Sequence, residues 1–403
     1  MRLAVDFNSF FASVEQQLDP ALRGRPVGVV PSLAETTCCI AASYEAKKFG
    51  VKTGTLVREA KKLCPEILLI VGDHTKYVEY HHRLVAAIDS VLQVEWTPSI
   101  DEMHCALNLR DQTPERASAI ARRIKQNIYK TVGEYLKCSI GIAPNSYLAK
   151  TASDMQKPDG LVVIEQKDLP QILHPLELRD FCGVGASMER RLHAHGIHTS
   201  EQLCAASKEE LHRAWGSVEG DLMWARLRGE EVYAPPVEQR SIGHSHVLPP
   251  QLRNDTDAHA VIHRMLQKAA MRLRKMKFVA GAMHIRISYL GHDSWSADGR
   301  FSETQDTISL SHFLDSLWAR RPHRKTPAPM AVGVTLLDLR AEQQQTLPLF
   351  AEEPAHPKLY QTVDKLNLRY GKNTVYFGRA HTARDSAPMR IAFTRIPDLD
   401  TER

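Results

Sequence analysis

The first eleven residues of this 403-residue chain, MRLAVDFNSFF, decide its architecture. The apolar run 3–5 predicts a short buried strand that ends on Asp6, after which Phe10, Phe11 and Val14 recur at helical spacing. A strand that carries a carboxylate at its C-terminal end and leads into a helix is typical of the start of an α/β layer.

A second acidic position follows far along the chain, where Asp101 and Glu102 fall at the expected turn of a β-hairpin. Carboxylates at strand ends cost desolvation energy unless a cation binds them. Oxygen ligands on adjacent strands are those that Mg²⁺ takes, and two such ions can activate a hydroxyl and stabilise a leaving pyrophosphate. Taken alone, Asp6 or a single Asp-Glu pair is more often a cap or a surface residue, so the interpretation depends on context.

Composition is that of a soluble globular protein, with 43% hydrophobic and 25% charged residues, and the length allows two to four domains. No apolar run approaches the roughly 18 residues of a membrane span, and the N-terminus lacks the features of a secretory signal. We expect a cytoplasmic protein that does not contact a membrane. The seven cysteines lack zinc-ligand spacing and predict reduced, mostly buried thiols.

Charge is unevenly distributed. The whole chain has a formal net charge of +5, whereas residues 240–340 alone hold 15 lysines and arginines against eight acidic residues. This region therefore carries the expected footprint of a polyanionic partner.

The pattern up to about residue 165 predicts alternating strands and helices. Strands are expected at 26–30, 67–71 and 138–142, and helices at 43–49, 57–63, 77–94, 114–129 and 147–155. A smaller helical region, 165–232, contains Gly183-Val184-Gly185. Such a hairpin can offer backbone N–H groups to phosphate, and a plain turn between helices explains the pattern equally well.

Beyond a proline-containing linker at 233–240, the pattern is α+β. Strands are expected at 283–289, 307–310 and 332–339, and helices at 258–276 and 311–319. Arg264, Lys268 and Arg272 form a stripe at i, i+4, i+8 in the first of these helices. Such a stripe is usually a solvated face, but the basic run at 320–325 favours contacts with phosphate groups.

Four segments together point to one protein family. They are VDFNSFFASVEQ (5–16), AASYEAKKFGVKTG (41–54), SIDEMH (99–104) and GIAPNSYLAKTASDMQKPDGLVV (141–163). Their order and spacing resemble the bacterial Y-family, translesion DNA polymerases. The resemblance continues through FCGVGASMERRLHAHGI (181–197) and RSIGHSH (240–246), and covers about residues 1–340.

The resemblance implies the chemical roles of the acidic residues. Asp6, Asp101 and Glu102 match the catalytic carboxylates that hold two Mg²⁺ ions, and the carbonyl of Phe7 matches a further metal ligand. The expected reaction is two-metal nucleotidyl transfer from deoxynucleoside triphosphates to a primer end on template DNA.

The resemblance also implies a nucleotide site. Phe11 matches the steric gate, an aromatic ring that excludes a ribose 2′-OH, although a core aromatic is the alternative, and Phe10 beside it is assigned to the same site. Tyr44, Lys47 and Lys157 match the residues that grip the triphosphate. Gly183 and Gly185 are assigned to DNA.

Four positions depart from the family pattern. Lys47 stands in place of arginine, which keeps the charge but loses the bidentate fork to phosphate. Asn8 replaces a frequent acidic residue, Met103 and His104 replace a small residue and an aromatic, and Ser146 replaces a basic residue. These departures leave the catalytic carboxylates in place and put rate and nucleotide affinity in question.

The C-terminal region carries a second signal. Gln345, Leu347, Leu349 and Phe350 resemble the peptide that binds the bacterial β sliding clamp, which would tether the enzyme. After residue 341 the Gln/Glu/Pro-rich sequence predicts that the chain leaves the folded body, with a short helical patch at 366–370 and about twenty disordered residues at the end. The segment 363–378 resembles C-terminal segments of some bacterial relatives.

The predicted fold is an α+β right hand. It has a palm (1–18 and 75–165), fingers (19–74), a helix-hairpin-helix thumb (166–232), a linker (233–240), a little finger (241–340) and a tail (341–403). We expect a monomeric, low-fidelity translesion DNA polymerase. The alternatives are a non-catalytic adaptor of the same family, some of which lack the carboxylates, and a nucleotide cyclase, whose palm would lack the Gly-x-Gly module and the basic little finger.

Overall fold

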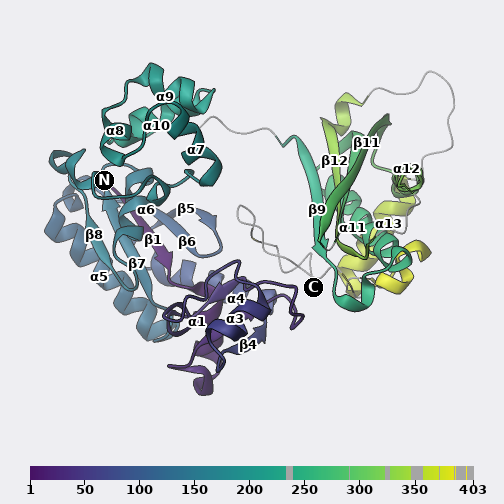
Figure 1. The fold of residues 1–403 in the computed structure, drawn as a ribbon, viewed down its shortest axis with the longest axis horizontal. Helices are drawn as coiled ribbons and strands as arrows, with labels where there is room; N and C mark the ends of the chain where they lie inside the picture. Colours follow the sequence, from purple (N-terminus) through teal and green to yellow (C-terminus); the bar gives the residue numbers. More distant parts are fainter. Residues whose placement is uncertain are drawn as a thin grey trace. The chain divides into compact units, whose positions relative to one another are not determined.

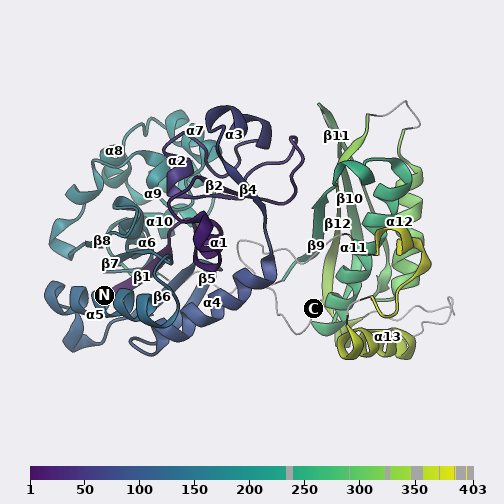
Figure 2. The same cartoon turned by 90° about the horizontal axis from the view of Figure 1, so that it is seen from below.

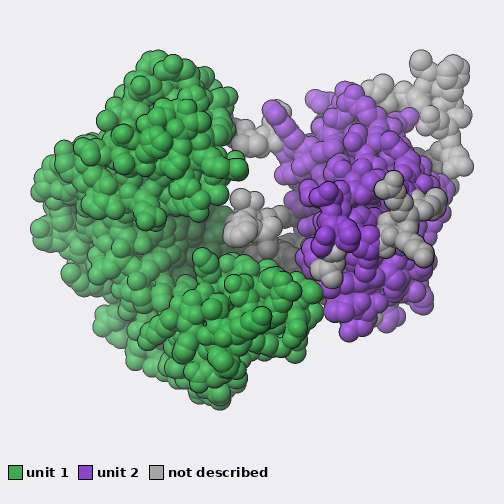
Figure 3. Space-filling model, viewed as in Figure 1, with its two compact units in different colours: residues 1–235, 390–397 green, residues 236–389, 398–403 purple. Residues whose placement is uncertain are grey.

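The computed structural model describes residues 1–232, 239–289, 291–322, 327–345, 357–371, 373–384, 386 and 396. The chain forms two compact units (Figure 3), residues 1–235 with 390–397 and residues 236–389 with 398–403. Each unit has its own hydrophobic core. The division between 235 and 236 falls within the linker that the sequence predicts.

Unit 1 is built on a five-stranded sheet of order β5-β6-β1-β7-β8 (Figure 1). The central strand β1 (Arg2–Phe7) is antiparallel to β6 (Glu102–Ala106) and β7 (Cys138–Ala143). The edges are β5 (Val94–Ser99), which forms the predicted hairpin with β6, and β8 (Leu161–Val163), which is parallel to β7. The C-terminal end of β1 therefore lies inside the sheet, where backbone pairing fixes it from both sides.

Helices cover this sheet. The helices α4 (His74–Asp89) and α5 (Pro114–Thr131) pack against each other, and α6 (Ser146–Met155) lies on β1 and β7. The predicted helix at 77–94 is wrong at its C-terminal end, because Val94 pairs with Cys105 as part of the sheet.

One glycine allows α6 to approach the sheet. A Cβ on Gly141 of β7 would lie 2.0 Å from the Ala149 carbonyl oxygen and 2.4 Å from the Ser153 nitrogen, both on α6. Only a residue without a side chain fits at this crossing. The depth at which α6 sits therefore depends on Gly141.

A smaller three-stranded sheet of order β3-β2-β4 forms a second part of unit 1. Its elements are α1 (Phe10–Leu18), β2 (Val27–Val30), β3 (Ala41–Ala42), α2 (Tyr44–Lys47), α3 (Val57–Leu63) and β4 (Leu68–Val71). Strand β2 pairs in parallel with β4 and antiparallel with β3. Val30, Val51 and Val57 belong to its core.

Four short helices complete unit 1. They are α7 (Ala186–Ala194), α8 (Ser200–Ala205), α9 (Lys208–Trp215) and α10 (Glu219–Leu227). Capping boxes begin α8, from Thr199 and Gln202, and α9, from Ser207 and Glu210. The helical character predicted for 165–232 is confirmed.

Unit 2 contains an antiparallel sheet of order β11-β10-β12-β9. Its elements are β9 (Ser241–Val247), α11 (Asp255–Lys275), β10 (Phe278–Tyr289), β11 (His292–Thr304), α12 (Thr307–Ala319) and β12 (Pro329–Ala341). The two helices cover one face of the sheet (Figure 2) and share its core. Short 3-10 turns occur in both units: η1 (Pro20–Leu22), η2 (Leu109–Asp111), η3 (Gln166–Asp168), η4 (Gln171–Leu173), η5 (Leu178–Asp180), η6 (Pro250–Leu252) and η7 (Glu342–Gln344).

The strand predicted at 307–310 is wrong. These residues form the first turn of α12, because Asp306 caps the helix and accepts a hydrogen bond of 2.8 Å from the Ser309 N–H. Strand β11 was not predicted at all, since its outer residues are polar and give no apolar run.

The expectation that the chain leaves the folded body after residue 341 is also wrong. Residues 357–384 form α13 (Pro357–Tyr370) and η8 (Gly378–Ala383), which belong to unit 2, and η8 packs against α11. Arg274 of α11 binds Asp364 through two hydrogen bonds of 2.7 and 2.9 Å, and Tyr360 is buried. The predicted helical patch at 366–370 is thus the end of a 14-residue helix, and most of the last twenty residues lie outside the described part of the chain.

Among the helices of the described residues, none is both long enough and apolar enough to cross a membrane.

The approach of α6 gives a stability prediction. Replacing Gly141 by alanine should lower the unfolding free energy of unit 1 by about 1–3 kcal/mol, because backbone atoms of α6 must move to admit the methyl group. The matched control is Gly281→Ala in β10, where the nearest atom to a Cβ is 3.5 Å away. Equal thermal unfolding midpoints for wild type and Gly141→Ala would contradict this packing.

Candidate active site

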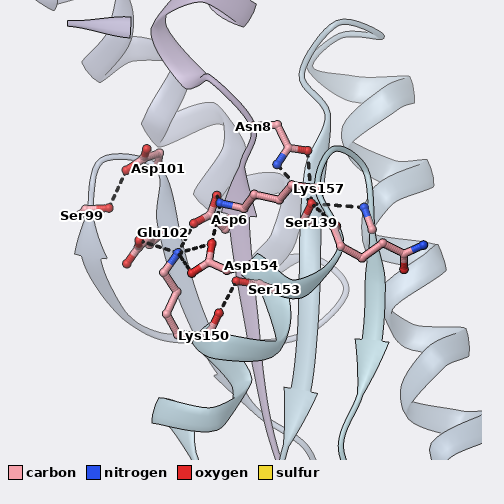
Figure 4. Close-up of polar contacts among 12 residues, drawn as sticks. Asp6, Asn8, Ser99, Asp101, Glu102, Ser139, Lys150, Ser153, Asp154 and Lys157 are labelled. Atoms are coloured by element: carbon pink, nitrogen blue, oxygen red, sulfur yellow. Dashed lines mark hydrogen bonds and ion pairs between the residues drawn. The ribbon is translucent and has the colours of Figure 1, made fainter. Parts of the chain in front are cut away.

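Three acidic residues meet at one end of the central sheet. Asp6 at the end of β1 pairs in register with Glu102 at the start of β6. Asp101 precedes it in the hairpin turn, and its carbonyl accepts a hydrogen bond of 2.9 Å from the Phe7 N–H. The structure therefore brings together the three carboxylates that the sequence singles out (Figure 4).

Two ammonium groups lie among these carboxylates. Lys150 of α6 contacts Asp6 and lies 3.0 Å from Glu102 Oε1, and Lys157 lies 2.7 Å from Asp6 Oδ1. Asp154 joins the two lysines, with its carboxylate 3.2 Å from Lys150 Nζ and 2.7 Å from Lys157 Nζ. The result is a partly buried network of alternating charges (Figure 4).

Burial changes the proton affinity of these groups. Desolvation raises the pKa of Asp101, although a hydrogen bond of 2.6 Å from the Ser99 hydroxyl opposes it. Desolvation likewise raises the pKa of Glu102, with Lys150 opposing. Burial alone would lower the pKa of Lys150, but the Asp6, Glu102 and Asp154 carboxylates raise it well above its usual value. The site thus holds carboxylates that are costly to ionise without a cation.

Asn8 positions the loop that carries Lys157. Its amide donates a hydrogen bond of 3.1 Å to the Ser139 hydroxyl, and its carbonyl oxygen accepts one of 2.8 Å from the Asp159 N–H. Ser139 also accepts from the Gly160 N–H at 3.2 Å. The neutral amide at position 8 can both donate and accept, which a carboxylate cannot, so this departure from the family pattern has a structural reason.

A stacked pair of aromatic rings lies at the start of α1, the helix that follows Asp6 in the sequence. The Phe11 ring stacks on Tyr77 with centroids 4.3 Å apart and an interplanar angle of 16°. Tyr77 is fully buried, and its hydroxyl donates a hydrogen bond of 2.7 Å to Glu15. Phe11 is half-buried, whereas Phe10 is only 3% exposed and packs in the core. The side chain of Phe10 is therefore directed into the core, and a contact of Phe10 with a nucleotide stays a prediction that its backbone would have to fulfil.

Tyr44 and Lys47 lie together on α2. The Lys47 ammonium stands 4.2 Å from the centre of the Tyr44 ring. Burial and the repulsion of Lys157 lower the pKa of Lys47, and attraction to Asp6 opposes this shift. The charges of the carboxylate site therefore act on the side chain of α2.

Ser146, which also departs from the family pattern, binds Glu231. Its hydroxyl and N–H donate hydrogen bonds of 3.0 and 3.2 Å to that carboxylate, which Arg2 also binds at 2.7 Å. Residue 231 is therefore anchored on unit 1 just before the predicted linker.

Three residues of this site escaped the sequence reasoning: Lys150, Asp154 and Tyr77. Lys150 and Asp154 lie four residues apart on α6, and Asp154 and Lys157 lie three apart, so all three could share one helix face. That spacing is a signal within segment 141–163. Tyr77 offered no signal beyond an apolar position in a predicted helix.

The donor set fits divalent metal ions. Carboxylate oxygens of Asp6 and Glu102, from two adjacent strands, meet around Lys150, which already supplies a positive charge among them. A metal ion held by these two carboxylates would compete with Lys150 Nζ for their oxygens.

The residues predicted to bind DNA divide into two groups. Gly183 and Gly185 are exposed, while Val184 between them is buried in the core. The DNA-facing basic stripe on α11 stays a prediction. Arg264 is 9% exposed and Lys268 is half-buried, and both line a cavity together with residues of α13. Arg272 on the same helix is half-buried.

Of the predicted clamp-binding residues, only Gln345 is described. Its side chain donates a hydrogen bond of 2.6 Å to the Glu303 carbonyl. Leu347, Leu349 and Phe350 lie outside the described residues.

Solved structures that resemble this chain include DNA polymerases. A chimeric Y-family DNA polymerase matches with a TM-score of 0.69 and 26% identity, over 84% of this chain and 99% of that one. An insertion ternary complex of Dbh DNA polymerase matches with a TM-score of 0.54 and 25% identity over the same shares. The fold is the Y-family polymerase right hand of palm, fingers, thumb and little finger.

Sequence comparisons agree. The chain matches the impB/mucB/samB family at residues 5–154, its C-terminal domain at 239–349 and its helix-hairpin-helix motif at 167–197. It is 34% identical to DNA polymerase IV of Moorella thermoacetica, covering 93% of this chain and 94% of that one. It is 30% identical to DNA polymerase IV 1 of Bacillus subtilis, covering 97% and 95%. The chain belongs to the impB/mucB/samB family.

The raised pKa of Asp101 predicts how the stability of the protein depends on pH when a chelator keeps it free of metal ions. A buried acid whose pKa is raised stabilises the fold when protonated, and this contribution is lost as the pH rises through the folded-state pKa. Asp101→Asn should therefore raise the unfolding midpoint at neutral pH, and the gain should shrink as the pH falls. Scanning calorimetry over a pH series measures this effect.

Asp154→Asn is the matched control, because it removes the partner of two lysines and should lower the midpoint instead. A lower midpoint for Asp101→Asn than for wild type at neutral pH would contradict the assigned desolvation cost.

Proposed function

We propose that this chain is a template-directed, low-fidelity DNA polymerase that extends primers across damaged template bases. The observation that carries the proposal is the meeting of Asp6, Asp101 and Glu102 on adjacent strands, beside two lysines. The family relationship and the named relatives support the same reaction. DNA and deoxynucleoside triphosphates are then the substrates, met in the cytoplasm.

Asp6, Asp101, Glu102 and the Phe7 carbonyl would hold two Mg²⁺ ions. When bound, such a pair supplies activation of the primer 3′-OH and stabilisation of the departing pyrophosphate. The protein's own contribution is to fix the oxygen ligands through sheet register and to provide positive charge from Lys150 and Lys157 in a partly desolvated site.

The triphosphate has several donors within reach of this site. The first N–H groups of α1, at Phe10 and Phe11, have no acceptor within the helix and favour an anion. Thus Phe10 would contribute its backbone. Tyr44, Lys47 and Lys157 add a hydroxyl and two ammonium groups, and Lys47 binds as a point charge where arginine would bind through two parallel bonds.

Phe11 would select deoxynucleotides. Its ring is held by stacking on Tyr77, which cannot move easily because it is fully buried and bonded to Glu15. A rigid ring at this position excludes the ribose 2′-OH sterically. The gate is therefore an aromatic pair, in which Tyr77 acts as the positioning residue.

The DNA-binding surface of unit 2 would be the face of its sheet opposite α11 and α12, which none of the described helices covers. Ile285 and Ile287 face the helices, so Arg286 and its register neighbours Gly333 and Ser296 face away from them. Gly243, Ser245 and Thr335 extend this face, which consists largely of small side chains that allow a phosphate backbone to approach closely. Gly183 and Gly185 in unit 1 would add backbone N–H contacts ahead of α7.

The domain assignment follows these roles. Residues 1–18 and 75–165 would form the palm, 19–74 the fingers, 166–232 the thumb and 241–340 the little finger. Fingers built on the small β3-β2-β4 sheet would enclose the nascent base pair loosely, which permits damaged templates and lowers fidelity.

A clamp tether remains part of the proposal. Gln345, Leu347, Leu349 and Phe350 have the pattern of a β-clamp peptide, and Gln345 would have to leave Glu303 to bind at a clamp rim. No observation favours the non-catalytic adaptor, since all three carboxylates are in place.

Primer extension tests the reaction. Asp101→Ala combined with Glu102→Ala should abolish incorporation of deoxynucleotides in Mg²⁺ because the ions lose two of three carboxylates. Circular dichroism should show an intact fold. Extension that survives the double substitution would refute the metal assignment, and a wild-type chain that binds DNA without extending a primer would favour the adaptor.

The steric gate predicts nucleotide selectivity. Phe11→Ala should increase incorporation of ribonucleotides relative to deoxynucleotides by at least about tenfold, which corresponds to about 1.4 kcal/mol. Tyr129→Ala removes an exposed aromatic ring on α5 and should leave selectivity unchanged, which makes it the control. Single-turnover incorporation of both nucleotides measures the ratio, and an unchanged ratio in Phe11→Ala would exclude a gate at this residue.

The open sheet face predicts the salt dependence of DNA binding. Arg286→Ala should weaken primer-template binding and lower the slope of log affinity against log salt by about 1. Arg369→Ala, an exposed arginine on α13, should change neither quantity. Fluorescence anisotropy over a salt series distinguishes the two variants, and a stronger effect of Arg369→Ala would place DNA on the helical side.

A further inference from the structure

A second cluster of metal-ligand side chains lies in unit 2, apart from the carboxylate site. His259 and His263 stand four residues apart on α11, and Asp315 faces them from α12. His263 Nε2 lies 2.8 Å and His259 Nε2 lies 3.0 Å from the same Asp315 oxygen, Oδ1. Two imidazoles and a carboxylate thus converge on one point.

The surroundings of this cluster favour neutral imidazoles. The side chain of His263 is fully buried, and burial lowers its pKa to about 4. Burial also lowers the pKa of His259, whose ring lies against Trp318. Burial therefore disfavours the charged form of both rings, and neutral imidazole is the form that binds metal ions.

Arg379 of η8 orients the carboxylate. Its guanidinium lies 2.6 Å from Asp315 Oδ2, the oxygen that does not face the histidines. This ion pair leaves Oδ1 directed at the two imidazoles, which is how a hydrogen-bonded neighbour orients a metal-ligating carboxylate.

We propose that His259, His263 and Asp315 bind one late first-row transition-metal ion, with Zn²⁺ as the natural candidate. Two histidines at i and i+4 on one helix face, with a carboxylate from another element, form a known type of zinc ligand set. The inference does not depend on the proposed polymerase activity.

The distances require little rearrangement. Tetrahedral Zn²⁺ with bonds of about 2.0–2.1 Å separates its ligand atoms by roughly 3.4 Å, so the pairs at 2.8 and 3.0 Å must open by roughly half an ångström. A water molecule would complete the fourth position. His263 Nδ1 has no hydrogen-bond partner among the described residues, so we expect weaker binding than at closed structural zinc sites, where that nitrogen is bonded.

Ligand type separates this site from the catalytic one. Two imidazole nitrogens favour Zn²⁺, Co²⁺ or Ni²⁺, whereas Mg²⁺ prefers the all-oxygen set of Asp6, Asp101 and Glu102. The nearby Arg379 charge further disfavours an ion held mainly by electrostatics. Excess Mg²⁺ should therefore not compete.

A bound ion would join three segments of unit 2. It would bridge α11 and α12 directly, and Asp315 would transmit this order to η8 through Arg379. The site thus has a structural consequence, which is a firmer attachment of the C-terminal segment that packs on α11.

Cobalt binding to the full chain tests the proposal. Metal-free protein is titrated with Co²⁺ in millimolar-excess Mg²⁺, and the visible absorption of nitrogen-coordinated Co²⁺ should saturate at one ion per chain. Zn²⁺ should then displace it. His259→Ala and Asp315→Asn should each weaken binding by at least about tenfold, the lower bound for losing an orienting neighbour. His263→Ala is measured beside these two variants and does not carry the test alone, because replacing a fully buried residue can affect folding.

Two controls locate the ion. His312→Ala, an exposed histidine on α12, should bind Co²⁺ like wild type. So should His193→Ala combined with His198→Ala, which removes the stacked histidine pair of unit 1. Hydrogen exchange of residues 377–384 should slow on Zn²⁺ addition in wild type only.

Absence of cobalt absorption would overturn the proposal and leave a hydrogen-bonded His-Asp-His cluster. Absorption that persists in folded His259→Ala and Asp315→Asn, or that disappears in the His193/His198 double variant, would overturn it as well.

Discussion

Asp6 is the constraint on which the catalytic unit depends. It is a carboxylate only 5% exposed, at the end of a central strand, and a buried charge of this kind is tolerable only beside opposite charge. The protein surrounds it with Lys150 and Lys157, which Asp154 holds in turn, and places Asp101 and Glu102 beside it. In the proposed reaction, these same acidic residues, which are costly to bury in the metal-free fold, would provide the ligands for the metal ions.

The rest of unit 1 keeps this arrangement in place. Gly141 allows α6 to lie close enough for Lys150 to reach β1, and the Asn8–Ser139 pair fixes the loop that carries Lys157. Tyr77 holds the ring of Phe11 in a similar way. Gly141, Asn8, Ser139 and Tyr77 thus position the charged and aromatic groups of the site. Asn8 departs from the family pattern, and the other three residues gave no sign of function in the sequence.

Much of this could be predicted from sequence because strand ends and helix faces leave local patterns. Strand β1, the β5-β6 hairpin, α5 and α6 follow from apolar patterns, whereas Asp6, Asp101 and Glu102 needed the family resemblance as well as their positions. Lys150 could not be assigned, because its role depends on the crossing of α6 over β7. The docking of the C-terminal segment on α11 through Asp364 and Tyr360 could not be predicted, because no local pattern reveals it. Strand β11 could not be predicted because its outward-facing residues are polar and give no apolar run.

The central claim of the proposed function is that Asp6, Asp101 and Glu102 hold two divalent ions when DNA and nucleotide bind. Electron paramagnetic resonance with Mn²⁺ in place of Mg²⁺ counts these ions directly, on a complex with a 3′-deoxy primer-template and a matched deoxynucleotide. The account predicts two tightly bound Mn²⁺ ions per chain in wild type and no tightly bound Mn²⁺ in the Asp101→Asn, Glu102→Gln double variant. Equal Mn²⁺ binding by wild type and this variant would contradict it.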